Sequence, residues 1–295
     1  MLLRGGSGQA GDVTALLAEQ ASAVLEVRSG RVDEIAGELL GQIDDAAELL
    51  VAVGGGRVID TAKALAAARE PHRRPRVAAI PTTLSAAEMT ATHRRAAGAD
   101  PKLPGARPAI VVNEPALSAS QPLDALAASA ANALGHAVEG PATTRSTPVP
   151  AFAGREAAHL IAEAYADPDD PDRETLALGA LLSGYAIDAN GYGLHHVVSQ
   201  TLAQFTPAWH GQANAAMLPH TLLALARRDV MGSGELIGLA AGLAGRAGAT
   251  RLRDLGVTEA QLDACADAAA GRADLDNTPP RADRDELRML YAAAY

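Results

Sequence analysis

The distribution of apolar residues divides the chain into two parts that meet near residue 115. In the first part, short apolar runs that end at glycine, proline or asparagine alternate with longer segments of helical character. Short runs bounded in this way are typical of buried strands, and strands separated by helices indicate βαβ units and a parallel sheet. We therefore expect strands at residues 23–27, 49–53, 77–80 and 109–112, with helices at residues 12–20, 32–40 and 59–68.

Beyond residue 115 the sequence has almost only helical patterns. Clusters of aspartate and proline interrupt these patterns at residues 167–171 and 274–281, and the last helix is expected at Arg284–Ala294. The predicted fold class is therefore an α/β domain with a Rossmann-like parallel sheet at residues 1–115, followed by an all-α domain at residues 116–295.

The composition favours a soluble, folded protein. Of the 295 residues, 48% are hydrophobic, which is enough apolar material for a core. The longest apolar run, Ile237–Gly245, is far shorter than the roughly 20 residues that span a bilayer. The first residues also lack the charged region, apolar core and cleavage site of a signal peptide. We expect a cytoplasmic protein with no membrane partner, and the single cysteine, Cys265, excludes an internal disulfide.

The charge of the chain is acidic, with a formal net value of −10 from 25 basic and 35 acidic side chains. Nucleic-acid-binding proteins gain much of their affinity from basic residues that neutralise phosphates, and many stack bases on aromatic rings. Here the basic residues are dispersed and only 3% of the residues are aromatic. We therefore exclude nucleic acid as a partner.

A run of glycines joins the second predicted strand to the following helix, at Gly54, Gly55 and Gly56. Glycine lets a backbone approach a diphosphate closely, and the start of a helix offers free N–H groups to an anion, so a nucleotide site is favoured there. The motif is neither GxGxxG nor a P-loop, however, and a tight turn needs glycine without any ligand. The turn with Thr82 and Thr83 follows the next strand and would place hydroxyl groups at the same edge of the sheet.

Several histidines lie near other polar residues in the helical part. Asn132 and His136 are four residues apart and so share one face of a helix, whereas His195 and His196 lie on another helix and His210 follows a helix break. Imidazole is a common ligand of zinc and iron, so three of these side chains could hold a divalent metal. The neutral amide of Asn132 is a poor substitute for an anionic ligand, which weakens the metal hypothesis.

Four segments, taken in order, resemble the iron-containing alcohol dehydrogenase superfamily, and within it the maleylacetate reductase branch: VAVGGGRVIDTAKA, IPTTLSAAEMT, NALGHAVEG and GLHHVVSQTLAQFTPAWHGQANAAMLPH. The resemblance covers nearly the whole chain. It implies a dehydroquinate synthase-like architecture, in which an active-site cleft lies between an N-terminal dinucleotide-binding domain and a C-terminal helical domain. It also implies NAD(P)H as cofactor and, by analogy, a homodimer.

The resemblance implies roles for particular residues. In metal-dependent members an aspartate and three histidines hold iron or zinc, at positions that match Asn132, His136, His196 and His210. Maleylacetate reductases resemble this chain in having asparagine at the first position and work without a metal, so we expect no metal at this degenerate site. The residues expected to bind the cofactor are Gly54, Gly55, Gly56, Arg57, Asp60, Thr82 and Thr83. The residues expected to be catalytic are Asn132, His136, His195, His196, Gln200 and His210.

The chain departs from the family pattern at positions where chemistry is expected. Arg57 replaces the serine that tends to follow the triple glycine, Leu84 begins a replacement of the usual Tyr-Ala-Gly-Ser, and Gln200 replaces a further histidine. The chain also begins with little before the first strand of the nucleotide fold.

The leading hypothesis is a metal-independent, NAD(P)H-dependent reductase of a small carboxylated enol or keto compound. In it, His195, His196 or His210 binds a substrate carboxylate or gives a proton near neutral pH. The alternative is a redox-neutral dehydratase, lyase or cyclase of specialised metabolism that has lost the use of nicotinamide, a hypothesis motivated by the three departures. A catalytically inactive relative is the third possibility, disfavoured because the histidines are still present.

Overall fold

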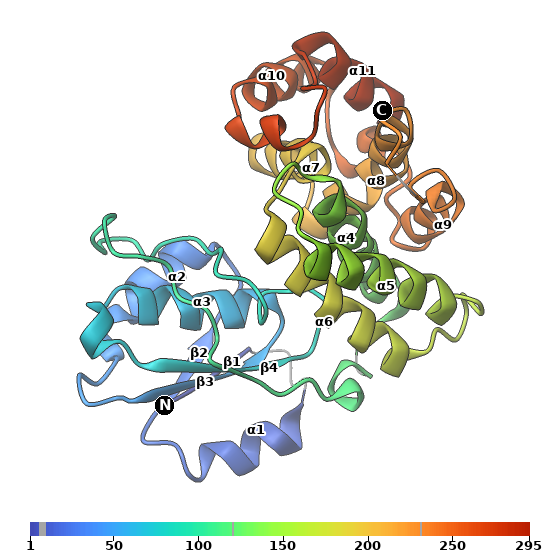
Figure 1. Cartoon of the computed structure of the whole chain (residues 1–295). Coiled ribbons are helices and arrows are strands. Elements are labelled where there is room, and N and C mark those ends of the chain that lie inside the picture. The colour runs from blue at the N-terminus through green and yellow to red at the C-terminus, as the bar shows by residue number, and fades with distance from the viewer. Residues whose placement is uncertain (6–9, 120, 231) are drawn as a thin grey trace. The chain divides into compact units, whose positions relative to one another are not determined.

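The structure is a computed structural model that describes residues 1–5, 10–119, 121–230 and 232–295 (Figure 1). Its contacts divide the chain into two compact units, Met1–Gln121 and Pro122–Tyr295. The first unit contains a parallel sheet with helices, and the second is helical, with no strand among its described residues. The predicted fold class is thereby confirmed.

The first unit is built on a five-stranded sheet with the order β2-β1-β3-β4-β5, in which each neighbouring pair of strands is parallel. Parallel neighbours need a crossover connection, and helices provide most of these connections. The strands are β1 (Leu2–Gly5), β2 (Val24–Val27), β3 (Leu49–Gly54), β4 (Arg76–Pro81) and β5 (Ile110–Val111). The helices are α1 (Gly11–Ala18), α2 (Val32–Leu39) and α3 (Gly56–Ala67), with 3₁₀ helices at Leu40–Gln42, Pro71–Arg73 and Pro115–Ser118.

The first strand corrects the expectation from sequence, which placed no strand before residue 23. β1 has only four residues, but it lies between β2 and β3 and pairs with both. A run of two leucines followed by arginine and glycine is too short to show a period of its own. The other four strands are confirmed, because their positions overlap the predicted ones.

Helices cover both faces of the sheet, with α2 and α3 on one side and α1 on the other (Figure 1). Successive strand residues point to opposite faces. Leu3 therefore joins the larger apolar cluster, which includes Ile35 of α2 and Ile59 of α3. Its neighbour Leu2 lies in the smaller cluster, against which Leu17 of α1 packs. The sheet is thus a rigid support for the loops that follow its strands.

A buried lysine ties α3 to the segment that follows β4. The side chain of Lys63 is 0% exposed, and its Nζ lies 2.8 Å from Asp60 Oδ1. The same ammonium group donates to the carbonyl oxygens of Ala87 and Thr92, each at 2.9 Å, and to the hydroxyl of Thr90 at 3.3 Å. A buried ammonium group is tolerated only when its N–H groups are paired, and here they bind three loop acceptors and one carboxylate.

Substitution Lys63→Met is expected to lower the free energy of unfolding by about 3 kcal/mol, because it leaves buried carbonyl groups without a donor and Asp60 without its cation. Lys102→Met is the matched control, since Lys102 is exposed, and its effect should stay within about 0.5 kcal/mol. Urea unfolding of both variants provides the measurement. Equal stability of the two would refute the anchoring role of Lys63.

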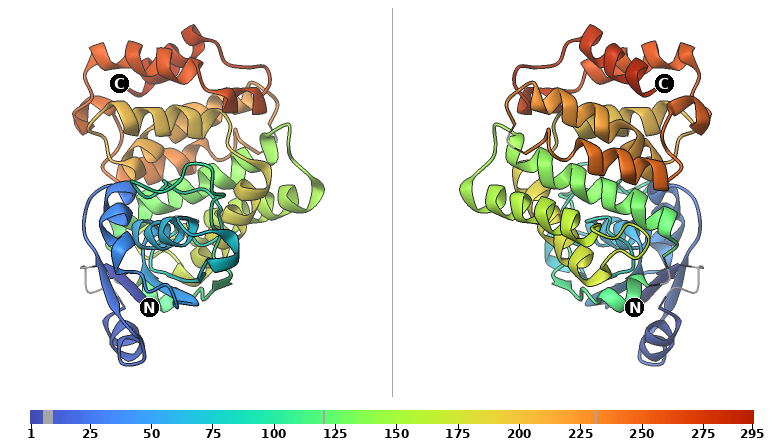
Figure 2. Two further views of the ribbon diagram at one scale, coloured as in Figure 1. Left: turned by 90° about the vertical axis from the view of Figure 1, so that its left-hand side faces the viewer. Right: turned by 90° about the vertical axis from the view of Figure 1, so that its right-hand side faces the viewer.

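The second unit consists of eight α-helices among its described residues, arranged in successive layers. Helices α4, α5 and α6 pack on one another, α4 packs against α8 and α9, and α10 and α11 contact α7 and α8 (Figure 2). The helices are α4 (Leu123–Ala142), α5 (Pro148–Ala164), α6 (Arg173–Asn190), α7 (Leu194–Phe205), α8 (His210–Ala226), α9 (Ile237–Arg246), α10 (Glu259–Ala270) and α11 (Arg284–Ala294). Short 3₁₀ helices occupy Leu252–Leu255 and Ala273–Asn277.

The helix breaks of the second unit follow the polar clusters of the sequence. The predicted break at residues 167–171 separates α5 from α6, and the bounds of α11 are those predicted for the last helix. None of the helices in the described part of the chain is long and apolar enough to cross a membrane.

Candidate active site

The glycine run forms the turn between β3 and α3. Gly54 has a φ of +154°, and a Cβ atom added to it would lie 2.6 Å from Val58 Cγ2. Gly55 precedes the helix, and α3 begins at Gly56, three residues earlier than predicted. The first N–H groups of a helix have no acceptor within it, so those of Gly56 and Arg57 are available to a ligand. This helix start is therefore competent to bind an anion.

The turn after β4 packs directly against the glycines. The backbone N–H of Thr82 donates to Gly54 O at 3.1 Å. A Cβ on Gly55 would lie 3.0 Å from Thr83 Cγ2, and one on Gly56 would lie 2.9 Å from Ser85 Oγ. The structure thus brings the two predicted cofactor-binding segments together at the carboxyl ends of β3 and β4. Close packing alone therefore favours glycine at all three positions, whether or not a ligand binds.

Two further residues expected to bind the cofactor differ in their surroundings. The side chain of Arg57 is exposed at the start of α3, where its positive charge adds to that of the helix N-terminus. Asp60 is the ion-pair partner of the buried Lys63. The carboxylate of Asp60 therefore has a structural task within the first unit.

In the second unit, three of the predicted histidines meet in the interior. His136 comes from α4, and His195 and His196 come from the first turn of α7. The rings of His136 and His196 are stacked with centroids 4.6 Å apart, and the ring of His195 meets that of His196 edge-on at 4.9 Å. Tyr192, from the loop before α7, lies 4.9 Å from the ring of His196. Each of the three histidines is almost fully buried.

The ring geometry does not fit a bound metal ion. An ion that binds an imidazole nitrogen lies in the plane of the ring, along the nitrogen lone pair. The stacked rings of His136 and His196 are within 9° of parallel, so no point near both rings lies in both planes. Asn132 adds a neutral amide in place of a carboxylate. Within the described ranges, no group of three or more His, Cys, Asp or Glu side chains is arranged to hold a metal.

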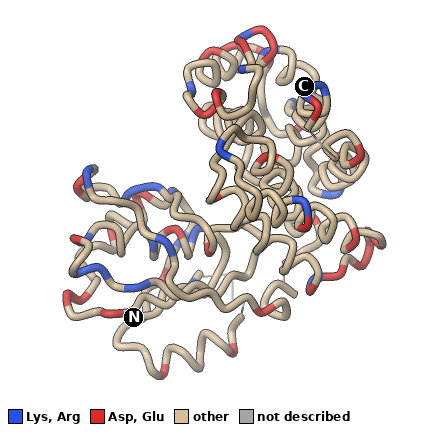
Figure 3. The backbone as a smooth tube through the Cα atoms, in the orientation of Figure 1, with Lys and Arg blue, Asp and Glu red and all other residues tan. Residues whose placement is uncertain are grey.

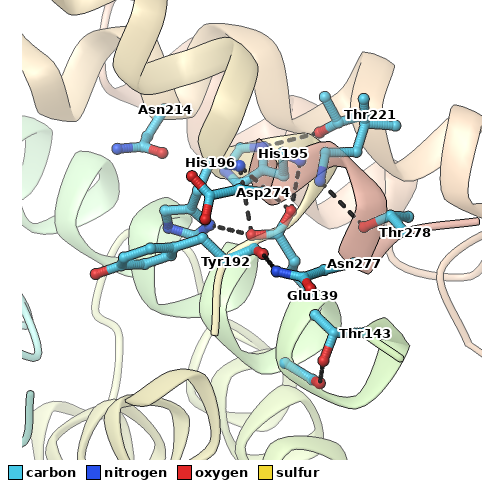
Figure 4. A network of polar contacts seen from close by, with 12 residues as sticks. Glu139, Thr143, Tyr192, His195, His196, Asn214, Thr221, Asp274, Asn277 and Thr278 are labelled. Carbon is cyan, nitrogen blue, oxygen red and sulfur yellow. Dashed lines mark hydrogen bonds and ion pairs between the residues drawn. The ribbon is translucent and has the colours of Figure 1, made fainter. Parts of the chain in front are cut away.

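A buried glutamate holds the start of α7. Glu139, from α4, is 0% exposed and accepts the backbone N–H of His195 at 2.5 Å and that of His196 at 3.3 Å. Its Oε2 atom lies 2.5 Å from Nδ1 of His196 (Figure 4). Nδ1 of His195 lies 2.8 Å from the hydroxyl of Thr221 on α8. The two histidines are thus each held through Nδ1, and Nε2 of both has no hydrogen-bond partner among the described residues.

Burial decides the charge of this cluster. Desolvation lowers the pKa of both His195 and His196 to about 3, and it lowers the pKa of His136 well below its usual value. The imidazoles are therefore neutral near pH 7. Burial raises the pKa of Glu139, while the nearby His195 and the N–H groups that point at the carboxylate act in the opposite direction.

The remaining predicted residues lie on α4, α7 and α8. His210 is exposed at the start of α8, with its Nε2 3.1 Å from Nδ2 of Asn214. Gln200 lies one turn after His196 on α7 and is half-buried. Asn132 is buried on α4, and its Oδ1 atom has no hydrogen-bond partner in the described part of the chain.

Glu139 is the residue that the sequence interpretation missed. It lies three residues after His136, and it is the one acid in the buried stretch of α4, whose other charged residue, Asp124, lies in the first turn. Helices α7 and α8 contain no Lys, Arg, Asp or Glu, the residue types that are coloured blue and red in Figure 3. An isolated acid in an apolar helix, one turn from a histidine, is a signal that could have been found. Thr221 and Thr278 carry no such signal, because they become neighbours of α7 only through folding.

The fold and both segments of the site define the family of this protein. The model of the Fe-containing alcohol dehydrogenase family, C-terminal, matches residues 126–244, and the model of iron-containing alcohol dehydrogenase matches residues 6–94. The chain is 32% identical to maleylacetate reductase 2 of Cupriavidus pinatubonensis over 85% of its own length and 74% of that relative. The chain belongs to the iron-containing alcohol dehydrogenase family.

Solved structures agree with this assignment. Maleylacetate reductase from Rhizobium sp. strain MTP-10005 is 25% identical, with a TM-score of 0.81, covering 100% of this chain and 89% of that one. Sulfoacetaldehyde reductase from Bifidobacterium kashiwanohense, solved in complex with NAD⁺, is 20% identical, with a TM-score of 0.80 over 99% of this chain and 90% of its own. These named relatives are oxidoreductases, and the second structure supports the shared fold.

Proposed function

We propose that this protein is an NAD(P)H-dependent reductase of a small carboxylated enol or keto compound and that it works without a metal ion. The observation that carries the proposal is the stacked pair of His136 and His196 beside Asn132. These residues occupy positions that match the metal ligands of metal-dependent members. The two imidazole rings are nearly parallel, however, so one ion cannot lie in the plane of both. Similarity to maleylacetate reductases supports the same substrate class.

The turn after β3 fits the diphosphate of a dinucleotide. Gly56 and Arg57 would donate backbone N–H groups from the first turn of α3, and the exposed side chain of Arg57 would add a positive charge. Thr82 and Thr83 would line the same edge of the sheet, because β4 ends beside β3. When bound, reduced nicotinamide supplies the hydride of the reaction.

The histidine cluster would hold the substrate and the proton. His195 and His196 present Nε2 atoms that have no partner among the described residues, so each is able to accept a proton or a hydrogen bond. A substrate carboxylate placed beside His196 would raise the pKa of the imidazole, because an opposite charge favours the protonated form. The negative charge of the substrate would thus favour protonation of His196, which would then supply the proton that the reduction consumes.

The test uses maleylacetate as the probe substrate with NADH and NADPH in turn, after treatment of the protein with EDTA. We expect the absorbance of the reduced nicotinamide to fall only when maleylacetate is present, and the rate to be the same with and without EDTA. Binding of either cofactor should also raise the melting temperature. The reductase proposal fails if neither cofactor is oxidised and neither changes the melting temperature at millimolar concentration.

The same assay separates the competing functions. Consumption of maleylacetate without any nicotinamide would establish the redox-neutral alternative, for which Arg57, Leu84 and Gln200 were the motive. Loss of activity in EDTA that Fe²⁺ or Zn²⁺ restores would overturn metal independence. A homodimer belongs to the same proposal, and light scattering during size-exclusion chromatography tests it.

A further inference from the structure

The first turn of α7 receives its hydrogen-bond acceptors from distant parts of the chain. Helices commonly begin with a side chain that accepts one of the free N–H groups of the first turn. Gly193 precedes α7 and has no such side chain, and a Cβ atom there would lie 2.2 Å from Thr278 Oγ1. Thr278 instead accepts the N–H of Leu194 at 3.1 Å, and Glu139 accepts those of the two histidines.

Of these two acceptors, only Glu139 also holds an imidazole. Its Oε2 atom lies 2.5 Å from His196 Nδ1, while its Oε1 atom receives the short backbone bond from His195. A carboxylate is favoured at this place, because the N-terminus of a helix carries a partial positive charge and several N–H groups point at it. An ionised carboxylate can only accept, so the hydrogen of the contact belongs to Nδ1 of His196.

The neighbouring contact of His195 is made with a hydroxyl group, which can donate or accept, so it does not fix the proton of that ring. The hydroxyl of Thr221 lies 3.1 Å from Met217 O, 3.0 Å from Leu218 O and 2.8 Å from Nδ1 of His195, so its single hydrogen has three acceptors within reach. The carboxylate contact thus places the proton of His196 on Nδ1 and leaves a lone pair on Nε2, the atom that has no partner among the described residues.

We propose that Glu139 is a positioning residue that holds His196 with its proton on Nδ1 and its lone pair on Nε2. The kinetic part of this inference rests on the proposed reductase function, whereas the position of the proton does not. One carboxylate caps α7 and orients the imidazole. The backbone N–H groups of His195 and His196 hold the carboxylate of Glu139 in place, and this carboxylate holds the ring of His196. A ligand in the cluster then meets an acceptor at Nε2 of His196.

The substitution Glu139→Gln keeps a side chain of the same size but replaces the acceptor that faces Nδ1 of His196 with a donor. The backbone N–H of His195 requires an acceptor at the position of Oε1, so the amide oxygen of Gln takes that position. The amide NH₂ group then faces Nδ1 of His196, and two donors cannot face each other. We expect His196 to shift its proton to Nε2, kcat for maleylacetate reduction to fall by about 10- to 100-fold, and KM for NAD(P)H to stay unchanged.

Thr278→Ala is the matched control. It removes the acceptor of Leu194 N–H at the same helix start but leaves the contact of Glu139 with His196 in place. If Glu139 acts only as a cap, both variants will lower the melting temperature and kcat alike, and the proposal is then overturned. If Glu139 positions His196, Thr278→Ala will keep kcat and the proton of His196 on Nδ1.

The position of the proton is read directly from ¹⁵N chemical shifts of the histidine side chains, with His196 assigned through His196→Asn. A spectrum of the unmodified protein with His196 protonated on Nε2 overturns the proposal, even if Glu139→Gln fails to fold. Protonation on Nδ1 in the unmodified protein, and on Nε2 in Glu139→Gln, supports it. If the unmodified protein does not reduce maleylacetate, the proposed function fails, while the spectra still decide the role of Glu139.

Discussion

His196→Asn is expected to lower kcat for maleylacetate reduction by about a hundredfold or more, because general acid–base groups contribute factors of this size. The asparagine Nδ2 group can donate to Glu139 in place of Nδ1, so the buried carboxylate keeps a partner. The variant nevertheless lacks an atom at the position of Nε2. Stopped-flow or steady-state oxidation of NAD(P)H measures the effect, and the melting temperature shows that the fold is kept.

The control for this variant is His159→Asn. His159 is exposed on α5, so its replacement should leave kcat unchanged. The variant His196→Asn should also bind NAD(P)H as the unmodified protein does, since the proposed cofactor site lies in the first unit. Full activity of His196→Asn would remove this residue from the catalytic role.

Gly54→Ala is expected to lower the free energy of unfolding by about 3 kcal/mol. A positive φ costs an alanine roughly 1–3 kcal/mol, and overpacking adds a similar amount. The added Cβ atom would lie 2.6 Å from Val58 Cγ2 and 2.9 Å from Val58 Cβ. Because this turn carries the proposed cofactor site, affinity for NAD(P)H should fall together with stability. Urea unfolding and cofactor titration measure the two effects.

Gly98→Ala separates the two causes. Gly98 also has a positive φ, of +85°, but nothing lies within 4 Å of an added Cβ atom. It should therefore show the backbone cost alone, about 1 kcal/mol. In the background Val58→Ala, Gly54→Ala should cost less stability than in the unmodified protein, because the contact with Cγ2 is then absent while that with Cβ remains. Equal losses in Gly54→Ala and Gly98→Ala would show that contact with Val58 contributes nothing.

Local sequence patterns were sufficient for most elements. The run LLVAVG has a length and a glycine end typical of a buried strand, and it forms β3. The cluster of proline and aspartate before Arg284 ends one helical region, and Asp283 then accepts the N–H of Glu286 and caps α11. Such features act over a few residues, so they can be recognised without the fold. The strand β1 was missed because four residues at the start of the chain carry too little pattern.

The sequence was sufficient to predict which glycines and histidines form the candidate site, but not their charge state or contacts. The glycines and histidines were found from their residue types, their spacing and a family resemblance. Their charge state was not, because the low pKa values of His195 and His196 come from burial among helices that are distant in sequence. Glu139 was missed for a related reason. Its partners in the first turn of α7 lie 56 and 57 residues further along the chain.

The sequence by itself determined the order of the helices and of every strand after β1, the change from an α/β to a helical part, and the residue types available for chemistry. These properties follow from local periodicity, turn residues and the hydrophobicity of each segment. The tertiary structure decided that β1 lies inside the sheet, that the rings of His136 and His196 stack instead of converging, and that Nε2 of His196 is left without a partner among the described residues. Each of these depends on contacts between segments that only folding brings together, where burial and hydrogen-bond geometry fix orientation and charge.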